Sequence, residues 1–198
     1  MKQAVLYIHG QGGSSTESEH YIPLFPHYEV SGLEYDGAMP WVAGRQIHDS
    51  VEELKARYER IILIANSIGA FFAMNAGIEE MIEKAYFISP VVDMERLILN
   101  MMNMQNITEQ QLEEKGVIAS AYGDDLSWEY LCYVRAHPLK WDVKTEILYG
   151  ENDNLTSFET INAFAQEHGA GLTVMKGGEH WFHTEEQMRF LDQWIKEN

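Results

Sequence analysis

Hydrophobic residues along the chain fall into short runs that alternate with longer, helix-like patterns. The short runs are rich in valine, isoleucine, leucine, tyrosine and phenylalanine, end in glycine or small polar residues, and predict strands at 4–8, 28–35, 60–65, 84–89, 146–149 and 171–175. Apolar residues at three- and four-residue spacing predict helices at 42–58 and 185–196, and the small, apolar segment 68–76 predicts a buried helix. This alternation is typical of βαβ units, so the pattern predicts an α/β fold with a mostly parallel sheet flanked by helices.

One stretch, 93–137, departs from this alternation. It has a helical pattern without a clear strand, and its 45 residues are too many for an ordinary crossover loop. We therefore expect an inserted helical cap over the top of the sheet. Its candidate lid residues are apolar or aromatic: Leu97, Ile98, Met101, Met102, Met104, Trp128, Tyr130, Leu131 and Tyr133. Methionines in such a segment are more often core filling, although methionines facing a pocket would suit acyl chains of variable shape.

Length, charge and cysteine content narrow the class of protein. The chain has 198 residues, which fits one domain, and 14 Lys and Arg against 31 Asp and Glu give a net charge of −17. Such a surface repels nucleic acid and anionic membranes. Cys132, the single cysteine, excludes an internal disulfide, and no apolar run approaches the roughly 20 residues that span a bilayer. Since nothing near Met1 resembles a signal peptide, we expect a cytoplasmic protein.

The most informative motif is the strand end at 61–70, Ile-Ile-Leu-Ile-Ala-Asn-Ser-Ile-Gly-Ala, in which Ser67 has a small residue two positions away on each side. A sharp turn from strand to helix needs this pattern, because larger side chains at 65 and 69 would clash. The serine hydroxyl is then exposed above the sheet, and the following helix aims backbone N–H groups at developing negative charge. On its own, the motif favours a nucleophile only slightly over a serine that caps a buried helix.

A glycine-rich loop, His-Gly-Gln-Gly-Gly-Ser at 9–14, follows the first predicted strand. It lets a backbone N–H turn toward the serine at the neighbouring strand end. The Gly-x-Gly pair, with Asp36 21 residues after Ser15, also suggests a dinucleotide site. However, Ser15 stands at the third glycine position, and Pro23 and Pro26 interrupt the helix that would have to begin there. We therefore predict no nucleotide cofactor.

Two more strand ends carry an acid and a histidine. Asp153 lies three residues past Gly150, and His180 follows the glycine pair at 177–178. An aspartate in a turn is usually only a turn former, and a lone histidine has equally little weight. Four strand ends with four suitable parts, in the chain order serine, aspartate, histidine, are an improbable coincidence.

Other residues compete for these roles. His183 lies three residues beyond His180 and could be the base, and Asp93 or Glu151 could be the acid. The pair His180-x-x-His183 has the spacing of metal ligands, but no cysteine or third histidine with ligand spacing accompanies it, so we predict no metal.

These motifs resemble the α/β-hydrolase superfamily, whose nucleophile elbow is normally Gly-x-Ser-x-Gly, with Ala65 here in place of the first glycine. The resemblance covers essentially the whole chain and implies a single α/β-hydrolase domain at 1–198 with a cap insertion at about 93–137. The first strand starts too close to Met1 for the N-terminal hairpin of larger members, which implies about six strands. Within the superfamily, the chain looks most like small bacterial carboxylesterases and the monoglyceride-lipase or serine-aminopeptidase-like group.

The resemblance also implies a mechanism. Ser67 would attack an acyl carbonyl, His180 would take and return the proton, and Asp153 would hold the imidazole. In such hydrolases the oxyanion donors map to the backbone N–H groups of Gln11 and Ile68. The resemblance implies a serine hydrolase of the carboxylic ester hydrolase class, without cofactor or metal.

The apolar cap and the net charge of −17 together suggest the substrate. No cluster of Arg or Lys marks a carboxylate or phosphate pocket. We therefore expect a small neutral ester with a short to medium apolar acyl chain as the partner. The alternative is a non-hydrolytic small-molecule-binding protein, a lyase or an acyltransferase on the same fold.

Overall fold

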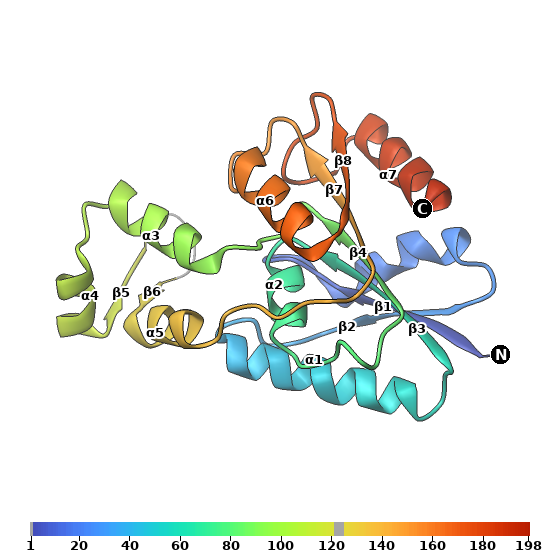
Figure 1. The fold of residues 1–198 in the computed structure, drawn as a ribbon, viewed down its shortest axis with the longest axis horizontal. Coiled ribbons are helices and arrows are strands. Elements are labelled where there is room, and N and C mark those ends of the chain that lie inside the picture. The colour runs from blue at the N-terminus through green and yellow to red at the C-terminus, as the bar shows by residue number, and fades with distance from the viewer. Residues whose placement is uncertain (1, 121–124) are drawn as a thin grey trace.

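The computed structural model describes residues 2–120 and 125–198 and contains a six-stranded sheet (Figure 1). All neighbouring strands are parallel, and their order is β2-β1-β3-β4-β7-β8. The strands are β1 (Gln3–Ile8), β2 (Glu29–Leu33), β3 (Arg60–Asn66), β4 (Lys84–Ile88), β7 (Thr145–Gly150) and β8 (Gly171–Met175). The predicted α/β fold with about six mostly parallel strands is confirmed.

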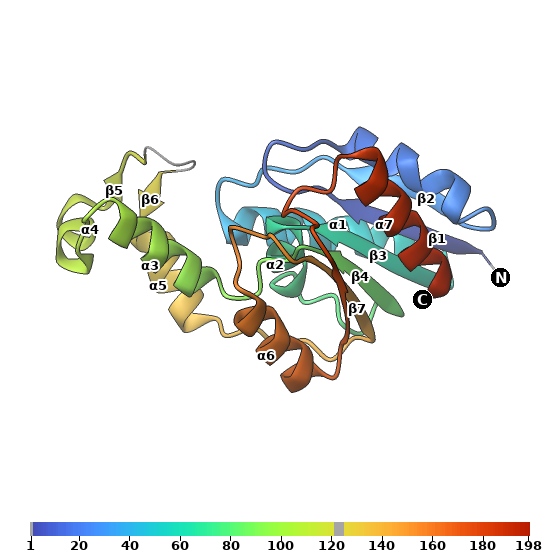
Figure 2. The ribbon, with the colours of Figure 1, turned by 90° about the horizontal axis from the view of Figure 1, so that it is seen from above.

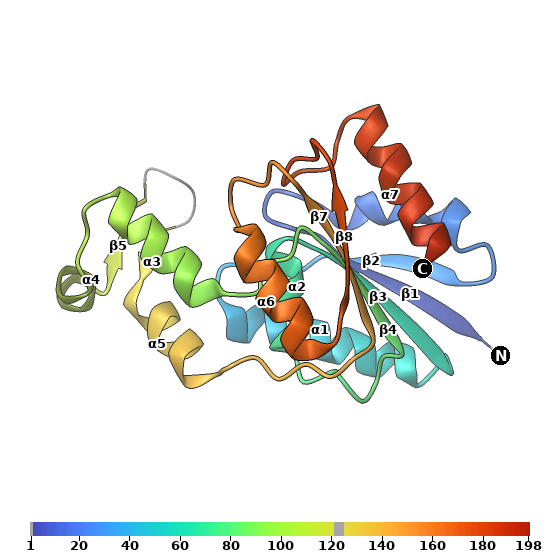
Figure 3. The same ribbon diagram turned by 45° about the horizontal axis from the view of Figure 1, so that its top comes forward.

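Helices cover both faces of this sheet. Successive strand residues point to opposite faces, and the apolar side chains on each face belong to a separate hydrophobic core. In β1, Leu6 and Ile8 belong to one hydrophobic core, and Val5 and Tyr7 belong to the other. The first core includes residues of α1 (Pro40–Lys55), α2 (Ile68–Met74) and α6 (Phe158–His168). The second includes residues of the 3₁₀ helix η1 (Ser15–Leu24) and of α7 (Glu185–Glu197), which lie together in Figure 3.

The chain between β4 and β7 forms a separate group of short elements, which we call the cap. These are α3 (Met94–Met104), α4 (Glu109–Lys115), β5 (Val117–Ile118), β6 (Leu126–Ser127) and α5 (Trp128–Ala136). Figures 1 and 2 show the cap extending away from the edge of the sheet at which α2 begins. Arg135 of α5 ties the three helices together, with Nε 2.6 Å from Glu95 Oε1 and Nη1 2.7 Å from Glu109 Oε2.

The structure differs from the predicted elements in a few places. The antiparallel pair β5 and β6 was not predicted, because two-residue strands are too short to show alternation. The helix predicted at 42–58 begins at Pro40 and ends at Lys55. Helices α6 and η1 were also not predicted, although Ser157 caps α6 and accepts a hydrogen bond from the Thr160 N–H. Within the described residues, no helix combines the length and apolar composition that crossing a bilayer requires.

Candidate active site

Strand β3 and helix α2 meet at Ser67 in a strained turn. Ser67 has φ 53° and ψ −121°, a positive-φ conformation that residues other than glycine rarely adopt. The turn also packs closely on the chain after β1, since a Cβ added to Gly69 would lie 2.4 Å from the His9 carbonyl oxygen. Ala65 is completely buried and fits where the motif normally has glycine. The structure therefore contains the sharp strand-to-helix turn that the motif predicts.

The structure brings together Ser67, His180 and Asp153, which follow three different strands. Ser67 Oγ lies 2.8 Å from His180 Nε2, and His180 Nδ1 lies 2.7 Å from Asp153 Oδ2. The parallel sheet places the carboxyl ends of β3, β7 and β8 at one edge, which explains how residues so distant in the sequence meet. A carboxylate only accepts hydrogen bonds, so the Nδ1–H group of His180 donates a hydrogen bond to Asp153. Nε2 of the same ring faces the serine hydroxyl.

Asp153 is held as an ion by several donors. Its side chain is completely buried, which alone would raise its pKa. The hydrogen bond and charge of His180, together with backbone N–H groups, outweigh this effect and lower the pKa of Asp153 below its ordinary value. Asp153 Oδ1 accepts from the N–H groups of Leu155 at 2.8 Å and Thr156 at 3.0 Å. The carboxylate is thus charged and fixed in orientation against the imidazole.

The turns that carry Asp153 and His180 pack directly against each other. A Cβ added to Gly150 would lie 2.5 Å from the Glu179 carbonyl oxygen, so only glycine fits at this approach. The Asn152 N–H donates to the Gly178 carbonyl at 2.8 Å, which joins the two turns through the backbone. The distance between acid and imidazole is therefore set by backbone contacts near the strand ends.

The loop after β1 lies beside Ser67 and carries Gln11. Ile8 pairs with Ala65 across the sheet, and a Cβ added to Gly10 would lie 3.1 Å from Ser67 Cβ. Gln11 and Ile68, the predicted oxyanion donors, both line a cavity that Ser67 also lines. The structure thus brings these two residues to the predicted nucleophile.

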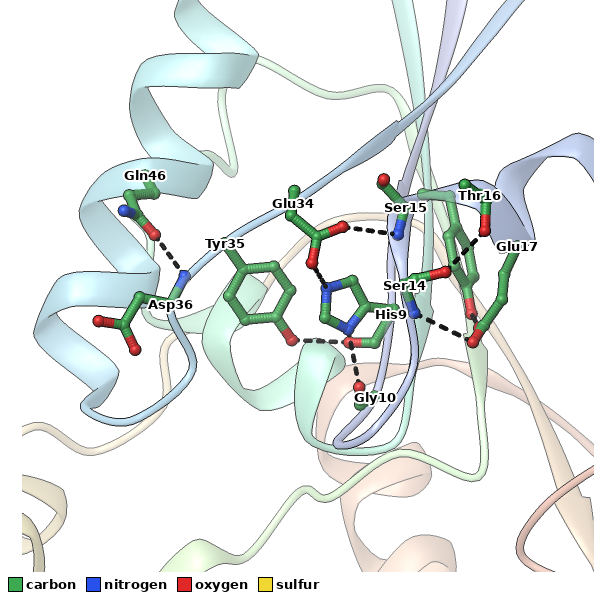
Figure 4. A network of polar contacts seen from close by, with 11 residues as sticks. His9, Gly10, Ser14, Ser15, Thr16, Glu17, Glu34, Tyr35, Asp36 and Gln46 are labelled. Carbon is green, nitrogen blue, oxygen red and sulfur yellow. Dashed lines mark hydrogen bonds and ion pairs between the residues drawn. The ribbon is translucent and has the colours of Figure 1, made fainter.

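Polar contacts hold this loop in place (Figure 4). The Tyr35 hydroxyl donates to the His9 carbonyl at 2.7 Å, and the two rings stack with centroids 4.5 Å apart. Glu34 lies between His9 and Ser15: its Oε1 is 3.8 Å from His9 Nε2, and its Oε2 accepts from the Ser15 N–H at 3.1 Å. The 3₁₀ helix η1 follows, with Pro23 inside it, where a dinucleotide site would need the start of an α-helix.

In the described part of the chain, Ser67 lines two cavities. The larger, about 510 Å³, is lined by Gln11, Glu17, Ser67, His180 and Trp181, among others. The smaller, about 120 Å³, lies between Ser67 and the cap and is lined largely by apolar side chains. Cavities of this kind, with a few converging polar groups, are typical of small-molecule sites.

The predicted lid residues lie in four different environments. Leu97, Ile98, Met101 and Tyr130 line the smaller cavity. Met102 and Leu131 are buried in the hydrophobic core, where they act as filling. Trp128 and Tyr133 are partly buried, and Tyr133 stacks on His137, whereas Met104 is 61% exposed.

The three competing residues have other partners in the structure. His183 Nδ1 lies 2.7 Å from the Trp181 carbonyl oxygen. Asp93 caps α3 by accepting from the Arg96 N–H at 2.9 Å. Glu151 accepts from the Gly177 N–H at 2.9 Å and so supports the glycine turn before His180.

Glu17 and Trp181 are among the residues of the larger cavity that sequence reasoning missed. Glu17 stands three residues after Ser14 in the spacing of a helix capping box, a signal that indicates its position but not the cavity it faces. Trp181 directly follows His180, which placed it near the site without fixing its direction. Across 2–120 and 125–198, no three His, Cys, Asp or Glu side chains gather in a group that could hold a metal ion.

Comparison with known proteins extends these findings. No family model and no curated protein matches the sequence. Among solved structures, Est1E from Butyrivibrio proteoclasticus has a TM-score of 0.78 at 15% identity, over 99% of this chain and 86% of that one. An α/β hydrolase from the metagenome of sediments of the Mar Chica lagoon, Morocco, has a TM-score of 0.62 at 21% identity, over 100% and 92%. A marine microorganism esterase has a TM-score of 0.60 at 14% identity, over 100% and 95%. With its parallel sheet, its strained Ser67 turn and these likenesses, the chain has the α/β-hydrolase fold.

Proposed function

We propose that the protein is a serine hydrolase that cleaves carboxylic esters at Ser67. The observation that carries this proposal is the continuous path of hydrogen bonds from Ser67 Oγ through the His180 ring to the buried carboxylate of Asp153. This arrangement supplies a nucleophile, a base within reach of its proton, and a group that orients the base.

The chemistry proceeds in two halves. Ser67 Oγ attacks the ester carbonyl carbon while its proton passes to His180 Nε2, and the resulting imidazolium is stabilised by Asp153. The carbonyl oxygen becomes an oxyanion, which the backbone N–H groups of Gln11 and Ile68 stabilise. When the carbon–oxygen bond breaks, the alcohol leaves with the proton from Nε2 and an acyl-enzyme remains. Water then repeats the sequence: it gives one proton to Nε2 and its oxygen adds to the acyl carbon. The bond between this carbon and Ser67 Oγ breaks, Nε2 returns the proton to Oγ, and the carboxylic acid leaves.

The smaller cavity supports an apolar acyl group. It opens at Ser67 and Ile68 and continues to Leu97, Ile98 and Met101 of the cap. Among the described residues, no lysine or arginine lines either cavity at Ser67, so a carboxylate or phosphate would find no cationic partner. We therefore propose esters with a neutral, apolar acyl group of short to medium length.

A fluorophosphonate probe tests the proposal. Attack by Ser67 Oγ forms a serine–phosphorus bond and releases fluoride, so mass spectrometry of the intact protein should find one adduct, mapped to Ser67 by digestion. The adduct should be absent in Ser67→Ala. Ser89→Ala is the matched control, because Ser89 is also a positive-φ serine that follows a strand, but its side chain is fully buried.

Two results would contradict the proposal. Folded wild-type protein that forms no adduct would indicate the alternative, a small-molecule-binding protein on the same fold. An adduct formed together with no turnover of any ester would instead favour a lyase or an acyltransferase.

A further inference from the structure

An ester bound at Ser67 would place its acyl part in one of the two cavities and its alcohol part in the other. The position of His180 indicates which cavity binds the alcohol part. The departing alcohol must take a proton from His180 Nε2, so it leaves on the side of the serine that faces this ring. His180 lines the larger cavity together with Glu17 and Trp181, whereas it does not line the smaller, apolar one. The larger cavity is therefore the site of the alcohol part. This assignment rests on the proposed function.

The charged side chains around this site are acidic. Glu17 lines the larger cavity and also the adjoining one of about 330 Å³, and Asp125 lines the smaller cavity under the cap. Among the described residues, no lysine or arginine lines any of these three cavities. With a net charge of −17 on the chain, the cleft concentrates small cations and repels anions.

Glu17 is fixed in position by two donors. The Tyr7 hydroxyl donates to Oε2, and the Ser14 N–H donates to Oε1 at 3.1 Å, as Figure 4 shows for Ser14. An ionised carboxylate has about four acceptor positions, so these two bonds leave capacity for a ligand. A preorganised carboxylate of this kind loses little freedom when it binds a cation.

Trp181 adds an aromatic surface at the same place. It lines both cavities that Glu17 lines, and it is 67% exposed, which is unusual for a tryptophan. Its ring stacks on His183, with centroids 4.3 Å apart and planes 18° from parallel, so the neighbouring imidazole supports it. Tryptophan is the strongest partner for cations in cation–π contacts, and quaternary ammonium groups are bound in this way.

We propose that the alcohol part of the substrate carries a positive charge, as in esters of amino alcohols or quaternary ammonium alcohols. Trp181 and the Glu17 carboxylate receive the cation, while the neutral acyl chain enters the cavity under the cap. The proposal keeps the neutral acyl part of the ester expected from the sequence and replaces its neutral alcohol part by a cationic one.

The test compares two isosteric substrates, the butyryl esters of choline and of 3,3-dimethylbutanol, which differ only in one positive charge. At low ionic strength, kcat/KM for the choline ester should exceed that for the neutral ester by about fivefold or more. Added salt should reduce this ratio, because it screens the attraction of the cleft. A ratio of one or below would overturn the inference.

Variants test which residues cause the preference for the choline ester. Trp181→Leu and Glu17→Gln should each reduce the ratio of the two kcat/KM values toward one. Glu19→Gln is the matched control, because Glu19 is exposed on the same 3₁₀ helix and lines none of the three cavities. It removes the same charge from the chain and should keep the ratio. A loss of preference in Glu19→Gln equal to that in Glu17→Gln would show that only net charge matters, and would overturn the assignment of the site.

The proposed function can fail separately. If neither ester is hydrolysed, serine hydrolase activity is contradicted, and a calorimetric titration of choline into Ser67→Ala decides whether the cation site exists. If choline binds to Ser67→Ala and this binding is lost in the double variant with Trp181→Leu, the cation site exists although the protein is not an ester hydrolase. No binding would reject both.

Discussion

Met101 offers a direct test of the proposal that the acyl chain enters the cavity under the cap. It lies on α3 and lines the 120 Å³ cavity that opens at Ser67. Met104 is on the same helix, three residues later, and is 61% exposed. Met101→Ala and Met104→Ala are therefore a matched pair: both remove the same three side-chain atoms from one helix, but only the first enlarges the cavity.

The cavity volume sets the expected chain length. An apolar cavity of about 150 Å³ holds a benzene molecule, so 120 Å³ holds about five carbon atoms. Burying each methylene contributes up to about 0.8 kcal/mol, which is up to roughly fourfold in kcat/KM per carbon. Two added carbons, from acetyl to butyryl, should raise kcat/KM by up to about 15-fold. Acyl chains longer than hexanoyl exceed the cavity volume, so kcat/KM should fall for them.

The assay is hydrolysis of p-nitrophenyl esters from acetyl to decanoyl by wild type and both variants. Met101→Ala makes room for about three further carbon atoms, so its optimum should move from butyryl or hexanoyl to octanoyl. Met104→Ala should keep the wild-type profile. A wild-type kcat/KM that falls steadily from acetyl to octanoyl would refute the assignment of this cavity to the acyl chain. An equal shift in Met104→Ala would show that the effect comes from loosening the cap.

Substitutions elsewhere at the site separate chemistry from stability. In ester hydrolysis, His180→Ala should lower kcat by about 10⁴ to 10⁶ and His183→Ala by about tenfold or less, and equal losses would make His183 the base. Asp153→Asn should lower kcat by about 10⁴, because the amide no longer stabilises the imidazolium. Since folding lowers the pKa of Asp153, its ionised form stabilises the native state above the unfolded pKa of about 3.9, and this contribution is lost as pH falls through the folded pKa. The difference in unfolding free energy between wild type and Asp153→Asn should therefore shrink below about pH 4 in urea titrations, and a constant difference would contradict this reasoning. Gly69→Ala should lower the unfolding free energy by about 1 to 3 kcal/mol, because its Cβ meets backbone, and an unchanged urea midpoint would show that the turn relaxes freely.

The sheet and the meeting of the three central residues could be predicted because they depend on local patterns and one topological rule. Buried strands on both faces read as continuous apolar runs, as at 61–65, and their ends are marked by glycine or small polar residues. In a parallel sheet all such ends on one side lie at a single edge. Ser67, Asp153 and His180 could therefore be placed together without knowledge of the strand order.

The direction of side chains in the cap could not be predicted, because it depends on how each helix is rotated against its neighbours. Met101, Met102 and Met104 are chemically identical, yet they line a cavity, fill the core and face solvent, respectively. Helical spacing shows only that their directions differ. The same limit applied to Trp181, whose position beside His180 was evident but whose exposure was not.

The glycines at 150 and 178 show how a local signal and a long-range contact can share one residue. Gly150 is the last residue of β7, and β8 ends at Met175, three residues before Gly178. The two glycines also touch: a Cβ added to Gly150 would lie 2.5 Å from the Glu179 carbonyl oxygen, and one added to Gly178 would lie 3.1 Å from Gly150 Cα. Gly178 accepts from the Asn152 N–H, and Glu151 accepts from the Gly177 N–H, so the turn of the acid and the turn of the imidazole form one backbone unit. Fixing them at the backbone lets a short aspartate reach the imidazole while its other oxygen remains bonded to N–H groups. The orientation of His180 toward Ser67 is thus a consequence of how β7 and β8 end.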